Sequence, residues 1–183
     1  MKNWVILFVK TGQEEKLVRM LKENLNVENY LPFIPYRETS RRTKGIIYKE
    51  QKLLFPGYVF VQTEIEADKI AQNLLSDITN IEELKDIYKI LHYGKNKKDV
   101  VMREKERQYW ERLLDSNLRI KGSVGVIEGG NIRITSGVLA GMENQIKRIN
   151  RHKREAVVEM EMMGTVCEVR VMLEIVEKNP NPL

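Results

Sequence analysis

The sequence predicts an α+β fold in two parts, an α+β domain over residues 1–115 and a small antiparallel β-barrel over residues 124–178. Amphipathic helical segments alternate with strand-like segments in the first part, whereas the second contains short stretches of alternating apolar and polar residues. Four glycines between residues 122 and 130 accompany this change of pattern. We therefore place a linker at 116–123 and expect a flexible tail at 179–183.

Composition excludes several classes of protein. Hydrophobic residues make up 42% of the 183 residues and charged residues 31%, which is typical of a globular chain. The longest early apolar run, residues 4–9, is far shorter than the roughly 20 residues that a membrane-spanning helix needs. The single cysteine, Cys167, cannot form an intramolecular disulfide, which fits a reducing cytoplasm. Two histidines and one cysteine, far apart in sequence, argue against zinc, and we expect no metal and no other cofactor.

The first elements are a strand and a helix. Residues 4–9 are continuously apolar, as in a buried strand. Thr11 and Glu14 match a capping box, in which the two side chains satisfy free backbone donors at the start of a helix. A stripe of leucines at helical spacing then predicts an amphipathic helix over 13–25.

The middle of the first part predicts a hairpin or loop, a strand and two helices. Residues 37–52 carry six basic side chains against two glutamates, so we expect a basic, mobile hairpin or loop. Pro56-Gly57 marks a turn, and a strand follows it. Apolar spacing predicts a short helix over 66–75 and a third helix over 103–115.

Period-two patterning dominates the C-terminal part. Apolar residues alternate with polar ones at 132–135, at 158–162 and at 168–171. Several such segments in succession predict an antiparallel sheet or a small barrel.

The sequence offers no constellation for catalysis. The glycines near residue 129 are not followed by the helix and Lys-Ser/Thr of a phosphate-binding loop. His92 and His152 have no Ser or Cys at a spacing that would make a nucleophile–base pair. We therefore expect a protein that is not an enzyme.

A dense basic run lies between two predicted strands. Residues 147–154 contain five full positive charges and no acidic residue. Lys and Arg at such density neutralise phosphates, and Arg also hydrogen-bonds guanine edges. The run is therefore either a nucleic-acid contact or a solubilising loop.

The strand after Pro56-Gly57 has an aromatic face. Tyr58 and Phe60 are two residues apart and share one face, while Val59 and Val61 share the other. If the valines face the core, the aromatic face is covered either by a helix of this chain or by a partner, since aromatic residues are favoured interface anchors.

These motifs resemble the NusG family of transcription elongation factors. Trp4-Val5 leading a strand, the helix 13–25 and above all the segment FPGYVFV at 55–61 resemble the family's N-terminal NGN domain. The segment GGNIRITSGVLAG at 129–141 resembles the opening of the family's SH3-like KOW barrel. The resemblance implies an N-terminal α/β sandwich with an antiparallel sheet and three helices, followed by the KOW barrel.

The resemblance also implies partners and contact residues. The N-terminal domain would bind the clamp helices of the RNA polymerase largest subunit, with contacts from Phe8, Phe55, Pro56, Tyr58 and Phe60. The helix 13–25 and its preceding turn would face the upstream DNA fork and the non-template strand, with contacts from Lys10, Gln13, Lys16 and Arg19. The basic KOW domain would bind a hairpin in nascent RNA, with contacts from Arg133, Lys147, Arg148, Arg151, His152, Lys153 and Arg154.

The C-terminal part departs from the family's housekeeping pattern. Gly137-Val138-Leu139 stands where Gly-Pro-Phe is usual, and Asn144 stands where a glycine is usual. The basic run most resembles the LoaP-type paralogues, bacterial cytoplasmic antiterminators that recognise a structured RNA leader, and we expect a monomer. Two alternatives are a general NusG-type elongation factor that links polymerase to Rho or the ribosome, and an rRNA-binding KOW protein.

Overall fold

The computed structural model describes residues 2–79, 81 and 84–176. It has a mixed α+β fold with three helices and several sheets, as the sequence predicts. The chain forms two compact units whose segments alternate along the sequence. Unit 1 comprises Met1–Pro35, Phe55–Tyr109 and Met162–Thr165, and unit 2 comprises Tyr36–Leu54, Trp110–Glu161 and Val166–Leu183. The predicted tail 179–183 lies outside the described residues.

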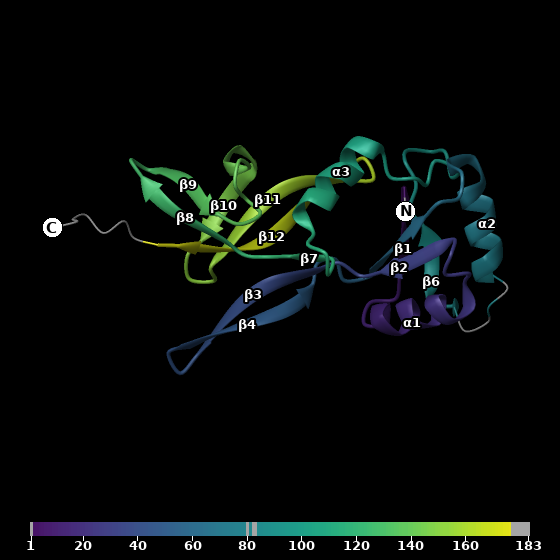
Figure 1. The fold of residues 1–183 in the computed structure, drawn as a ribbon, viewed down its shortest axis with the longest axis horizontal. Helices are drawn as coiled ribbons and strands as arrows, with labels where there is room; N and C mark the ends of the chain where they lie inside the picture. Colours follow the sequence, from purple (N-terminus) through teal and green to yellow (C-terminus); the bar gives the residue numbers. More distant parts are fainter. Residues whose placement is uncertain (1, 80, 82–83, 177–183) are drawn as a thin grey trace. The chain divides into compact units, whose positions relative to one another are not determined.

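Unit 1 is built on a four-stranded antiparallel sheet in the order β2-β5-β1-β6. Figure 1 labels three of these strands, β1, β2 and β6. Its strands are β1 (Asn3–Val9), β2 (Tyr30–Phe33), β5 (Tyr58–Thr63) and β6 (Ile87–Ile90). The structure thus confirms the predicted strand at 4–9 and the antiparallel N-terminal sheet. Trp4 to Leu7 are at most 2% exposed, because both faces of this central strand are covered.

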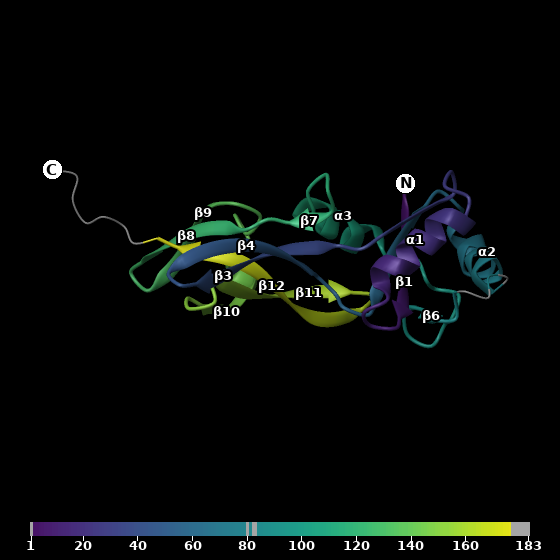
Figure 2. The same ribbon diagram turned by 90° about the horizontal axis from the view of Figure 1, so that it is seen from below.

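The three helices are α1 (Glu14–Asn24), α2 (Ala67–Thr79) and α3 (Glu104–Leu113). Each buries the stripe that predicts it, including Leu17 and Leu21 on α1 and Ile70 and Leu74 on α2. Helix α1 contacts strands β2 and β5. Figure 2 shows α1 and α2 in the region of β1 and β6. The second helix extends four residues beyond the predicted end at residue 75 because Ile78 is also buried.

The capping box predicted at the start of the first helix does not form. Gln13 is the N-cap residue and makes no side-chain capping hydrogen bond. Glu14 instead turns inward and is 1% exposed. Its carboxylate accepts hydrogen bonds from two glycine amides, so it is not free to reach back to the residue that the capping box requires.

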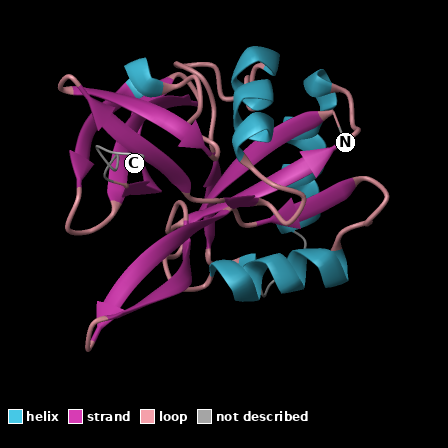
Figure 3. Cartoon of the chain, turned by 60° about the vertical axis from the view of Figure 1, so that its left-hand side comes forward, coloured by secondary structure: helices cyan, strands magenta, loops and turns pink. Residues whose placement is uncertain are grey.

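Unit 2 contains a hairpin of β3 (Tyr36–Thr43) and β4 (Ile46–Leu53). The turn residues Lys44 and Gly45 have positive φ angles of 50° and 83°, which suits a tight hairpin turn. The short strand β7 (Arg119–Ile120) adds to β3 in parallel. Figure 3 shows the hairpin extending to a free turn at the lower left. Of the two forms expected for residues 37–52, the structure has the hairpin.

The other sheet of unit 2 has five strands in the order β10-β11-β12-β8-β9. They are β8 (Ser123–Glu128), β9 (Asn131–Ser136), β10 (Ile146–Asn150), β11 (Glu155–Met162) and β12 (Thr165–Ile175). Strands β12 and β8 pair in parallel, so the prediction of a wholly antiparallel barrel is wrong at this pair. Apolar alternation identifies the inward face of a strand but carries no information about its direction. Closure into a barrel stays a prediction.

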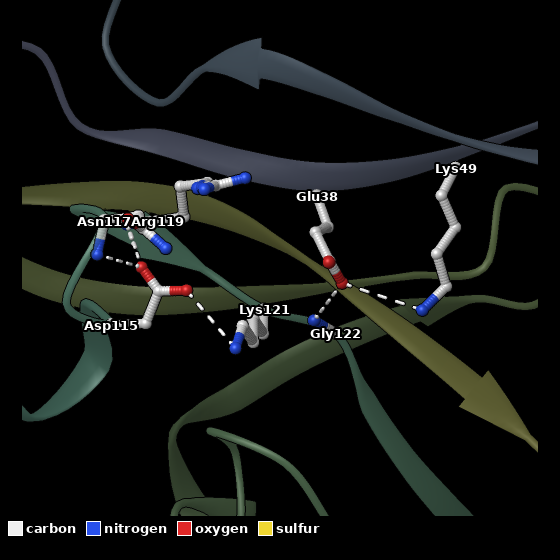
Figure 4. Close-up of polar contacts among 7 residues, drawn as sticks. All are labelled: Glu38, Lys49, Asp115, Asn117, Arg119, Lys121 and Gly122. Carbon is white, nitrogen blue, oxygen red and sulfur yellow. Dashed lines mark hydrogen bonds and ion pairs between the residues drawn. The ribbon is translucent and has the colours of Figure 1, made fainter.

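The segment predicted as a linker is held by two carboxylates (Figure 4). Asp115 accepts hydrogen bonds from the backbone amides of Asn117 (2.8 Å) and Arg119 (3.0 Å), and it lies 3.4 Å from the Lys121 ammonium. At the other end, the Gly122 amide donates to Glu38 (2.9 Å). Residues 119 and 120 between these contacts form β7. The division into domains at 1–115 and 124–178 stays a prediction about which parts fold independently.

We expect replacement of Asp115 by Asn to destabilise the chain at pH 7 by roughly 1–3 kcal/mol, because it weakens bonds to two amides. Burial, the largest influence, raises the pKa of Asp115, but the Arg119 and Asn117 amides and Lys121 together lower it below the usual 3.8. The stabilising contribution is therefore present above pH 3.8 and is lost as pH falls through the lowered pKa. Urea unfolding at several values between about pH 7 and pH 3 measures the free energy of unfolding as a function of pH. This free energy should fall less steeply toward acid pH in the variant than in the wild type, and equal pH dependence in the two proteins would contradict this account.

Candidate functional site

A cluster of aromatic side chains lies partly exposed on the sheet of unit 1. Phe8 on β1 stands directly opposite Tyr58 on β5, and their ring centroids are 5.5 Å apart. The ring centroid of Tyr88 on β6 lies 5.5 Å from that of Phe8, on the side of β1 opposite to β5. The ring centroids of Phe55 and Tyr58 are 6.5 Å apart, and the two rings pack edge to face. We call these four residues the aromatic cluster.

The most exposed member of the cluster is Tyr88 on β6. Phe8, Phe55 and Tyr58 are half-buried, and Tyr88 is 57% exposed. The Lys89 ammonium lies 5.8 Å from the Phe8 ring centroid, within the range of a cation–π contact. Tyr88 is not among the contact residues that the sequence predicts. The chain bulges between Phe8 and Val9 where β1 pairs with β6, and the sequence gives no signal for this irregularity.

Phe60 differs from the other predicted polymerase contacts because it belongs to the core. It is 1% exposed and packs against Trp4, Phe33 and Phe55, with ring centroids 5.4 to 6.3 Å apart. Val59 and Val61 on the opposite face are also fully buried. Of the two alternatives for the aromatic face, the structure covers Phe60 with side chains of this chain, whereas Tyr58 on the same strand stays half-buried. Alternation identifies two faces of a strand but does not reveal that both are covered.

A buried carboxylate fixes the turn that precedes Tyr58. Glu14 accepts a hydrogen bond from the Gly57 amide (2.6 Å) and a second from the Gly12 amide (2.8 Å). The Gly57 carbonyl accepts from the Val9 amide (2.8 Å), which ties the turn to the end of β1. Gly57 has a φ of 87°, and a Cβ there would lie 3.1 Å from the Thr11 hydroxyl. These contacts set where β5 begins, and Pro56 at the exposed corner of the turn is held with it.

Substitution of Glu14 by Gln should destabilise the chain by roughly 1–3 kcal/mol, since a neutral amide cannot accept strongly from both the buried Gly57 amide and the Gly12 amide. Glu23→Gln on the exposed side of the same helix is the matched control and should change stability little. Guanidinium unfolding of both variants measures the difference. Equal stability of the two variants would show that the Glu14 contacts do not hold this turn.

The predicted DNA contacts lie on α1 and the turn before it. Lys10 is exposed and lies 3.7 Å from Asp86, while Gln13 is half-buried at the N-cap position. Lys16 and Arg19 are both exposed and three residues apart, so they share one side of the helix. Neither has a carboxylate at ion-pair distance within the part of the chain that the structure describes.

Acidic neighbours offset much of the basic charge of the five-stranded sheet. Four of the seven predicted RNA contacts form ion pairs: Arg133–Glu128 (3.3 Å), Lys147–Glu159 (2.7 Å), Arg148–Glu168 (3.2 Å) and Arg154–Glu174 (3.0 Å). The other three, Arg151, His152 and Lys153, lie exposed in the turn between β10 and β11. Among the seven predicted RNA contacts, those without an ion pair in the described part of the chain therefore all lie in this turn.

A second carboxylate, Glu106 on α3, is buried and fully engaged by neighbours. It accepts hydrogen bonds from the Tyr93 hydroxyl (2.5 Å) and from the Met163 amide. Burial first and the bond to Glu106 second raise the pKa of the Tyr93 hydroxyl. The Arg103 guanidinium stacks 4.4 Å above the Tyr93 ring. These contacts hold the turn Met162–Thr165 within unit 1, which is a structural rather than a catalytic arrangement.

The described residues contain no group of three or more His, Cys, Asp or Glu side chains that could hold a metal ion. Across the same residues, no helix has the length and apolar character needed to span a membrane.

Comparison with protein families assigns the chain to a class. The family model NusG, described as "Transcription termination factor nusG", matches residues 2–110, which is more than half of the chain. The chain therefore belongs to the NusG family. A search of curated proteins gives no match. Members of the family are transcription factors that bind RNA polymerase and are not enzymes, and the matched segment contains the whole aromatic cluster.

Proposed function

We propose that this chain is a specialised transcription elongation factor that promotes processive antitermination. In this account the aromatic cluster binds the clamp helices of the RNA polymerase largest subunit, and the basic turn between β10 and β11 binds a structured nascent RNA. The observation that carries the proposal is the partly exposed aromatic cluster within the segment that matches the NusG family.

The chemistry of the cluster suits a helical partner. Neighbouring ring centroids lie 5.5 to 6.5 Å apart along the series Phe55, Tyr58, Phe8 and Tyr88. Half-buried tyrosines bury large area at small entropic cost, and each hydroxyl keeps a polar end at the rim of an interface. Glu14 and the Pro-Gly turn hold Tyr58 before any partner binds, which reduces the cost of ordering the surface.

Replacement of Tyr58 or Tyr88 by Ala should weaken binding to purified RNA polymerase at least tenfold, about 1.4 kcal/mol, because each change removes an aromatic anchor. Tyr48→Ala is the matched control, since Tyr48 is a 47% exposed tyrosine on the hairpin outside the cluster. Biolayer interferometry measures affinity, and circular dichroism checks that each variant is folded. Folded cluster variants that bind as tightly as the control would remove this surface from the interface.

Polymerase docking would leave α1 available to DNA. The exposed cations Lys16 and Arg19 share one side of this helix, and Lys10 and Gln13 lie at its start. Under the proposal these four residues contact the upstream fork and the non-template strand through phosphates, with no sequence preference of their own.

The proposed RNA contact rests on the turn between β10 and β11. Arg151 and Lys153 are exposed cations there, and the Lys153 amide donates to the Asn150 side chain (2.9 Å), which shapes the turn. The paired residues of the same sheet contribute less, because a phosphate must compete with the carboxylate already present. We place the strongest phosphate contacts at the turn for this reason.

A double substitution, Arg151→Ala with Lys153→Ala, should weaken binding to an RNA hairpin and reduce the slope of log affinity against log salt. Removing one cation from a phosphate should lower this slope by roughly 0.7–0.9. Lys147→Ala with Arg148→Ala is the control of equal charge, and we expect a smaller effect because both residues are ion-paired. Salt titrations followed by fluorescence anisotropy test the difference, and an unchanged slope would exclude the turn from the interface.

One observation favours a second candidate, a general NusG-type elongation factor that links polymerase to Rho or the ribosome. The ion pairs of Arg133, Lys147, Arg148 and Arg154 are what a solvated basic surface would also show. Absence of RNA binding together with retained polymerase binding would select this candidate. An rRNA-binding protein would not account for the family match over 2–110. Under either elongation-factor proposal we expect a cytoplasmic monomer.

A further inference from the structure

The bulge in β6 brings a cation as well as a ring to the aromatic cluster. Phe8 on β1 pairs with Lys89 on β6. The next residue, Val9, pairs with Ile87, so Tyr88 is an extra residue on β6. Consecutive side chains of a regular strand point to opposite faces, and a bulge re-aims them. Here the Tyr88 ring centroid lies 5.5 Å from that of Phe8, and the Lys89 ammonium lies 5.8 Å from the same centroid.

The charge of Lys89 has no counterion in the protein itself. Lys89 is exposed, and no carboxylate lies at ion-pair distance from it within residues 2–79, 81 and 84–176. Lys10, at the end of β1, differs in this respect because it lies 3.7 Å from Asp86. The Phe8 ring offers Lys89 a cation–π contact but no formal negative charge. The ammonium of Lys89 therefore depends mainly on water for its solvation.

A partner that covers the aromatic cluster must also accommodate this charge. Because the ammonium lies 5.8 Å from the Phe8 centroid, a helix packed on that ring displaces water from Lys89 as well. Removing water from an ammonium is costly unless a charged or polar group of the partner replaces that water. A carboxylate does so with a charge-assisted hydrogen bond, whereas a wholly apolar helix face offers nothing. The surface therefore favours a helix that carries an acidic residue beside its apolar ones.

We propose that Lys89 is a specificity residue of the polymerase-binding surface, and that the polymerase helix docked on the aromatic cluster places an Asp or Glu carboxylate on its ammonium. This inference rests on the proposed binding of polymerase and adds the residue Lys89 and the chemistry of the helix that it recognises. The rings supply most of the affinity. The ion pair selects among apolar helices, since complementary charges govern association rate and choice of partner more than affinity.

The test measures association of the full chain with purified RNA polymerase, free of nucleic acid, at several salt concentrations. Lys89→Met removes the charge but keeps a flexible side chain beside Phe8, and Lys89→Glu reverses the charge. At low salt we expect the association rate constant to fall about threefold for Lys89→Met and about tenfold for Lys89→Glu, with both differences shrinking as salt rises. Lys105→Met and Lys105→Glu, at an exposed position on α3, are the controls for the change in net charge.

Each outcome separates the role of Lys89 from polymerase binding by the cluster. Lys89 variants that associate as fast as the Lys105 variants would overturn the acidic contact, while weakened binding of Tyr88→Ala would leave the polymerase-binding surface in place. Normal binding by Tyr88→Ala as well would overturn both. Slower association of the Lys89 variants by the same factor at every salt concentration would also overturn the inference, because salt screens an ion pair but not a loss of packing.

Discussion

The candidate polymerase-binding surface depends on one buried carboxylate. Glu14 would ordinarily cap a helix or face water, yet here it is 1% exposed and accepts hydrogen bonds from the amides of Gly12 and Gly57. Burial of a charge is costly unless hydrogen bonds satisfy it, and these two amides supply that compensation. The contact joins the start of α1 to the turn before β5. Helix, turn and central sheet therefore adopt one arrangement, in which Tyr58 stands beside Phe8.

The same principle operates at other irregular segments of the chain. Asp115 and Glu38 accept hydrogen bonds from backbone amides of the segment around β7, and Glu106 accepts one from the turn at Met163. In each case a carboxylate side chain supplies hydrogen bonds that a regular ladder does not provide at that point. Acidic residues thus position the loops and turns, whereas basic residues such as Arg151 and Lys153 remain exposed to a ligand.

Much of the fold could be predicted from the sequence because its strongest signals are local. Leu17 and Leu21 mark α1 by their spacing, and the run at 4–9 marks β1 by its continuity. The contacts that complete the site are not local. Glu14 accepts a hydrogen bond from Gly57, which is 43 residues away in sequence. Tyr88 joins the aromatic cluster because β6 pairs with β1. Arg170 on β12 lies beside residues of the turn between β10 and β11. These contacts depend on the order of the strands in each sheet, and the spacing of apolar residues in the sequence does not predict that order.

Photocrosslinking tests the central claim, that the aromatic cluster is the surface that meets RNA polymerase. A photoreactive phenylalanine derivative placed at position 88 occupies the most exposed ring of the cluster, and the same group at Val166, which is 68% exposed in unit 2, is the comparison. The account predicts that position 88 crosslinks to the polymerase largest subunit and that position 166 does not. Failure of position 88 to crosslink, with polymerase still bound, would contradict it.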